Sequence, residues 1–133
     1  MKPTIVALCA GILVPLLGAC AATPTAMMAD VQDAEPLYSG SFPGNYESLS
    51  ACVALAWGRE PIVWDLRQVI DAPNETAVVQ GNYRVFMSAY PMHKTLRQAD
   101  DATVAVDFRQ TPGAKEAPEW VWQAVENCAH KGA

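Results

Sequence analysis

The hydrophobic pattern of residues 46–57 repeats every three or four positions, which is typical of a helix with one buried face. Asn45 precedes this stretch and is a favoured N-cap residue, and Gly58 stands where the chain should leave the helix. The face expected to be buried consists of Tyr46, Leu49, Val53 and Trp57, with Cys52 and Ala56 beside them.

A second helix is predicted near the C-terminus. Pro118 suits the first helical position, Glu119 complements the positive end of the helix dipole, and Lys131 with Gly132 marks the end. The intervals i, i+3, i+4 and i+7 are all apolar, so one continuous stripe should face the core. That stripe consists of Val121, Ala124, Val125 and Cys128.

Between the two helices, apolar and polar residues alternate as they do in half-buried strands. In the first of these strands, Trp64, Leu66 and Ile70 are expected on one face. Asp65 and Arg67 are expected on the other. The polar stretch 91–101 is predicted to be a loop, and Gly81 a bend or bulge. The alternation predicts strands at about 62–70, 77–90 and 103–109.

These elements predict an α+β fold in the order α-β-β-β-α. Two amphipathic helices would cover one face of a three-stranded antiparallel sheet and form a small two-layer sandwich. If residues 46–57 are not helical, a predominantly β barrel is the alternative. The folded domain is expected to span residues 45–133.

The N-terminus has a different pattern. After Lys2, the chain from Ile5 to Leu17 is almost continuously apolar. This run is shorter than the roughly 20 residues that a membrane-spanning helix needs, and it fits the apolar region of a secretory signal. The alternative is a buried N-terminal helix of a cytosolic protein.

The run ends in Leu17-Gly18-Ala19-Cys20, which resembles the lipobox of bacterial lipoproteins. The resemblance implies that residues 1–19 are a signal peptide and that Leu17, Gly18 and Ala19 are recognised by the signal peptidase. It also implies that Cys20 becomes an N-terminus carrying diacylglycerol and a further fatty acid such as palmitate. Ala21 then favours the outer membrane, with the protein facing the periplasm.

Residues 20–44 are rich in Ala, Thr, Pro, Ser and Gly and show no helical or strand period. Such a stretch buries too little apolar surface to offset its ordering entropy, so it is predicted to be a flexible tether behind the lipid.

Composition narrows the possible functions. The chain has 133 residues, enough for one small domain, and a formal charge of −5, which argues against a nucleic-acid partner. Of its 4 cysteines, Cys9 leaves with the signal and Cys20 takes the lipid. Cys52 and Cys128 lie on the apolar faces of the two helices and are predicted to form a disulfide. Two free thiols are the alternative, and a metal site that includes His130 is less favoured.

No catalytic motif, cofactor site or small-molecule site is recognisable in the sequence. Trp120, Trp122 and His93 are candidates for a contact surface. The favoured function is a lipid-anchored, non-catalytic protein-interaction module of the cell envelope. A periplasmic inhibitor or immunity protein against a cell-wall-active enzyme is the alternative, and a hydrolase using His93 is a third hypothesis.

Overall fold

The computed structural model describes residues 31–85, 88–110 and 118–132. The predicted signal peptide and its motif from Leu17 to Cys20 lie outside these residues. The described elements, in chain order, are β1 (Tyr38–Pro43), α2 (Tyr46–Gly58), β2 (Val63–Asp71), a 3-10 turn (Ala72–Asn74), β3 (Thr76–Val85), β4 (Ser88–Asp100), β5 (Thr103–Gln110) and α3 (Glu119–His130).

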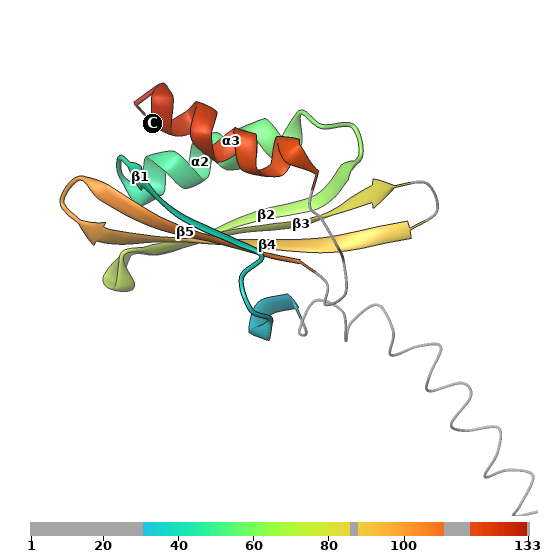
Figure 1. The fold of residues 1–133 in the computed structure, drawn as a ribbon, viewed down its shortest axis with the longest axis horizontal. Coiled ribbons are helices and arrows are strands. Elements are labelled where there is room, and N and C mark those ends of the chain that lie inside the picture. Colours follow the sequence, from blue (N-terminus) through green and yellow to red (C-terminus); the bar gives the residue numbers. More distant parts are fainter. Residues whose placement is uncertain (1–30, 86–87, 111–117, 133) are drawn as a thin grey trace, which may run out of the picture.

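The strands form one antiparallel sheet in the order β1-β5-β4-β3-β2, so β1 and β2 are its edges. Helices α2 and α3 lie together over one face, and a short helical segment at 31–33 lies on the opposite side (Figure 1). The prediction of a three-stranded sheet with two helices is therefore wrong. The described chain has five strands, three α-helical segments and one 3-10 turn in a mostly β architecture.

Strand β1 lies within the stretch that was expected to be a tether. Tyr38 pairs with Phe108 and Phe42 pairs with Val104, so residues 38–43 belong to the folded domain. The expected tether over 20–44 is thus too long at its C-terminal end. The short length of β1 and its serine and glycine residues conceal the alternation of Tyr38 and Phe42.

Strand β4 was expected to be partly loop and partly a continuation of the strand before it. Instead, β3 ends at Val85 and β4 begins at Ser88. The loop predicted over 91–101 is mostly strand, in which Met92, Lys94 and Leu96 are fully buried. The inward lysine interrupts the apolar alternation, which is why the polar composition suggested a loop.

Both helix predictions are confirmed. The Asn45 side chain accepts hydrogen bonds from the backbone N–H groups of Glu47 (2.9 Å) and Ser48 (3.2 Å), which caps α2. Helix α3 begins at Glu119, and Pro118 is its N-cap residue rather than its first helical residue.

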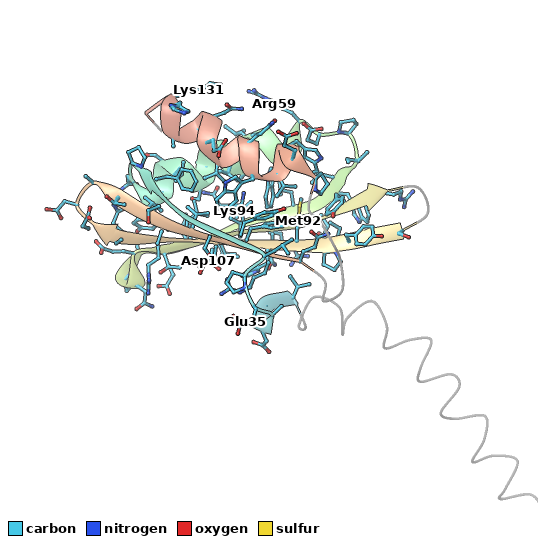
Figure 2. All side chains as sticks on the ribbon, in the orientation of Figure 1. Glu35, Arg59, Met92, Lys94, Asp107 and Lys131 are labelled. Atoms are coloured by element: carbon cyan, nitrogen blue, oxygen red, sulfur yellow. A yellow bond between two sulfur atoms is a disulfide. The ribbon has the colours of Figure 1, made fainter. Side chains whose placement is uncertain are left out.

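The core lies between the sheet and the two helices, where the side chains of both layers meet (Figure 2). The stripes predicted for the helices point into it, and a disulfide between Cys52 and Cys128 joins α2 to α3, in agreement with the pairing expected from the sequence. The two Cα atoms are 5.8 Å apart, so the helices lie side by side. The disulfide therefore holds together the two helices that cover the sheet.

Strand β2 is irregular. Its pairing with β3 shifts by one residue between Trp64 and Arg67, and Asp65 adopts a left-handed backbone conformation with φ of 52°. This bulge turns Leu66 toward the helices. Trp64 instead lies beneath Arg84, whose Cζ atom is 5.3 Å from the centre of the Trp64 ring. Trp64 and Leu66 thus lie on different faces, and the expectation that they share one is wrong.

Candidate functional site

A group of exposed apolar side chains lies along the β2 edge of the sheet. Leu55 on α2 is 65% exposed and Val69 on β2 is 54% exposed. Gln68 donates a hydrogen bond to Ser50 of α2, so Ile70 lies on the helix side of the strand and Val69 on the opposite side, and the group wraps around the sheet edge. Exposed apolar side chains beside an unpaired strand edge favour contact with another molecule. We call this group the β2-edge surface. It comprises Leu55, Ile62, Trp64, Val69 and Ile70.

A groove of about 650 Å³ separates α2 from β2 beside this surface. Its walls are mainly apolar and come from Ala54 and Leu55 on the helix and from Leu66 on the strand. The Arg59 side chain also lines it, and Arg59 forms no ion pair within the described ranges. The outer backbone groups of β2 are free to pair, because no described strand lies beyond it.

The most unusual group in the core is Lys94, which is fully buried without a carboxylate partner among the described residues. Its Nζ donates a hydrogen bond of 2.8 Å to the backbone carbonyl of Val121 in α3. The same Nζ lies 4.7 Å from the ring centre of Trp57, 5.4 Å from that of Trp122 and 5.6 Å from that of Phe108. Three aromatic rings and one carbonyl thus surround the amine.

Burial sets the protonation behaviour of this lysine. Loss of hydration lowers the pKa of Lys94 well below its ordinary value, because an ammonium ion is costly to bury. The aromatic faces and the Val121 carbonyl offset part of that cost. A lowered pKa is typical of a nucleophilic amine, but the Lys94 side chain has no contact with solvent and so cannot meet a substrate in this structure. We interpret it as a structural group that binds α3 to the sheet.

His93, a candidate for the contact surface, lies in β4 and not in a loop. Its exposed fraction is only 8%, and its Nδ1 atom has no hydrogen-bond partner among the described residues. Burial lowers the pKa of His93, and the neighbouring Arg109 guanidinium lowers it further. Because the side chain alternates with the core-facing Lys94, it lies on the sheet face opposite α2 and α3.

Trp120 and Trp122, the other two candidates, are half-buried on the two flanks of α3. Trp120 makes edge contacts with Trp57 and Tyr83. Trp122 packs against Phe42 and also shields Lys94. Both rings therefore extend the core, and the structure separates them from His93, which lies on the other side of the sheet. The three candidates do not form one surface.

The sequence reasoning missed the β2-edge surface and Lys94. Two signals pointed to the surface. Leu55 falls outside the apolar stripe of its helix, and Val69 and Ile70 are adjacent apolar residues in a strand, so one of them must face away from the core. No signal in the sequence identified Lys94 as buried, because a lysine is rarely found inside a core.

Other chemistry is not apparent in the described part of the chain. Over residues 31–85, 88–110 and 118–132, no group of three His, Cys, Asp or Glu side chains is arranged to hold a metal ion. Within the same ranges, no helix has both the length and the apolar character needed to cross a bilayer. Comparison of the chain with protein-family models, curated protein sequences and solved structures finds no match.

Proposed function

We propose that the chain is a lipid-anchored lipoprotein of the cell envelope whose domain faces the periplasm and acts as a non-catalytic protein-interaction module. The β2-edge surface carries the interaction part of this proposal, because exposed apolar side chains there adjoin an open strand edge and a groove. The motif ending at Cys20 supports the anchor. The Cys52–Cys128 disulfide supports an oxidising compartment, in which such bonds persist.

The anchor is tested by growing cells that express the chain with radiolabelled palmitate. The parent should take up label, and Cys20→Ser should take up none. Cys9→Ser is the matched control, because Cys9 also follows an apolar run and should not affect labelling. An unlabelled parent, or a labelled Cys20→Ser variant, would contradict the lipid anchor.

The contact surface is tested by placing a photo-crosslinking amino acid at Leu55 in living cells. Arg97 is the matched control position, since it is exposed on β4 away from the β2-edge surface. We expect protein adducts from position 55 well above those from position 97. Equal yields at the two positions would show that this surface has no special role in contact.

A second function is favoured by charge. Removal of Lys2 with the signal peptide changes the formal charge from −5 to −6, which would draw a basic target such as a cell-wall hydrolase through electrostatic steering. The two functions differ in the adduct recovered from position 55. A hydrolase would indicate an inhibitor or immunity protein, whereas a structural envelope protein would indicate a scaffold.

A further inference from the structure

The outer half of β2 has a sequence that is complementary to itself. Residues 67–71 read Arg-Gln-Val-Ile-Asp and follow the bulge in regular register with β3. Because side chains alternate along a strand, Arg67, Val69 and Asp71 share one face. A basic residue and an acidic residue therefore lie at equal distances on either side of a central valine.

From this arrangement we propose that the β2-edge surface binds a second copy of the chain by antiparallel pairing of the two β2 strands. A two-fold axis through Val69 places it opposite the Val69 of the second copy. Arg67 then faces Asp71 of the second copy, and Asp71 faces Arg67. Each charged side chain meets an opposite charge, as a two-fold symmetric interface requires.

The charged groups have capacity left for such a contact. The Arg67 guanidinium lies 3.4 Å from the Asp65 carboxylate, yet both side chains are more than half exposed. A guanidinium has five N–H donors, so this single contact does not saturate it. One carboxylate oxygen of Asp71 accepts a hydrogen bond of 2.7 Å from Asn74, which leaves the other oxygen for an incoming cation.

The same pairing covers part of the apolar surface, at Val69 and Ile70, whereas Ile62 and Trp64 precede the bulge and lie outside the paired segment. An axis perpendicular to the sheet keeps both α2 helices on the same side of the joined sheet, so both Leu55 side chains and both grooves flank the seam. Ile70, which is 42% exposed, then lies opposite Gln68 of the second copy. The pairing would shield apolar surface that the single chain leaves in water.

The other sheet edge is less suited to such pairing. On β1, the Tyr38 and Phe42 side chains already pack against Trp122 of α3. The strand also ends at Pro43, which has no backbone N–H to donate. The bulge at Asp65 in turn limits pairing on β2 to the segment 67–71.

The pairing deepens the proposed function, since it names the partner at the same surface. Five residues of strand and one helical side chain form a small interface, so we expect weak association in dilute solution. Anchoring two copies in one membrane would raise their effective concentration and favour the pair. Crosslinking of the full-length chain in membranes therefore suits this test better than dilute chromatography.

The test is a Val69→Cys variant of the full-length chain, oxidised in isolated membranes with copper phenanthroline. Directly opposed residues of antiparallel strands have Cα atoms about 4.5–5.5 Å apart, which is within the range that a disulfide spans. We expect a dimer band that disappears on reduction. The parent chain is oxidised alongside and reports any linkage through Cys9 or Cys20.

Matched variants test the register. In the proposed pairing, the two copies of residue 67 lie about 14 Å apart, which is too far for a disulfide. The Arg67→Cys variant should therefore give no more linked dimer than the parent chain. Ser41→Cys, on the β1 edge, should also remain there. In the Val69→Cys chain, Arg67→Asp should weaken linkage about tenfold, and addition of Asp71→Arg should restore it.

Linkage of Val69→Cys at only the parent level would overturn the pairing. Equal linkage at positions 41, 67 and 69 would also overturn it, because that result indicates random collision. A Val69→Cys chain that links to a different protein would overturn the second copy as partner while leaving the interaction module in place. Palmitate labelling reports on the anchor independently of all these results.

Discussion

Replacing Cys52 and Cys128 by alanine removes the covalent link between α2 and α3. The two cysteines are 76 positions apart, so the disulfide closes a long loop in the unfolded chain. The chain-entropy model gives about 4.5 kcal/mol of stabilisation for a loop of this length, and measured values are typically about 2–4 kcal/mol. The free energy of unfolding of a small domain is about 5–15 kcal/mol, so losing the disulfide removes a large share of it.

The assay is urea unfolding of the full-length chain in detergent, followed by tryptophan fluorescence. At a slope of about 1–3 kcal/mol per molar urea, a loss of about 3 kcal/mol lowers the midpoint by about 1–3 M. Four variants form a cycle: the parent, Cys52→Ala, Cys128→Ala and the double variant. Because each single change already breaks the bond, each should cost nearly as much as the double change.

Additive costs would refute this reasoning. If the two thiols were unpaired, each substitution would remove only its own buried sulfur, and the double variant would lose the sum of the two. Cys128 is 2% exposed, so its alanine variant would then show the larger loss, from the cavity it leaves. A parent midpoint unchanged by reducing agent would also contradict a stabilising disulfide.

Three further predictions concern single side chains. For Lys94, the unfolded chain binds more protons than the folded chain between the lowered folded pKa and the unfolded value of about 10.4, so the free energy of unfolding should rise with pH across that interval. Lys94→Met should flatten that rise and leave stability at pH 7 unchanged or up to about 2 kcal/mol higher in urea titrations; an unchanged slope would contradict the lowered pKa. Asn45→Ala removes two hydrogen bonds at the start of α2 and should cost about 1 kcal/mol in the same titration, whereas no loss would contradict the cap. Gly40→Ala would place a Cβ atom 3.0 Å from Cε2 of Phe42 and 3.1 Å from Cζ2 of Trp122, so it should lower the free energy of unfolding by about 1–3 kcal/mol in the same titration; a midpoint equal to that of the parent would show that the rings move aside freely.

The two helices were predictable because their signals are local. The cap at Asn45 and the stripe containing Val121 and Cys128 depend only on residues within a few turns. The disulfide followed from placing one cysteine on each stripe. Strand β5, expected over 103–109, was predictable for the same reason, because its alternation is uninterrupted.

The missed strands depend on partners distant in sequence. Residues 38–43 become a strand only because β5 offers an edge, and their own pattern is too short to predict one. In β4, Lys94 is buried because aromatic rings from α2, β5 and α3 converge on its amine. Because lysine is usually exposed, the sequence pattern predicts a loop where Lys94 in fact points into the core from a strand. Pro91 added to the error, although the strand accommodates it: Pro91 pairs with Asn82 of β3, and the described pairing with β5 ends one residue later, at Met92.

The candidate surface depends on strand order and on one backbone torsion angle. Asp65 is of a residue type that tolerates the left-handed conformation, and its bulge shifts the pleat by one residue so that Trp64 joins the exposed side chains. The complementary charges of Arg67 and Asp71 are visible in the sequence, but they have no consequence for association in a central strand. They matter because β2 is an edge, and β2 is an edge because β1 pairs with β5 rather than with β2. The property that suggests a partner therefore arises from topology, and a local reading of the sequence could not supply it.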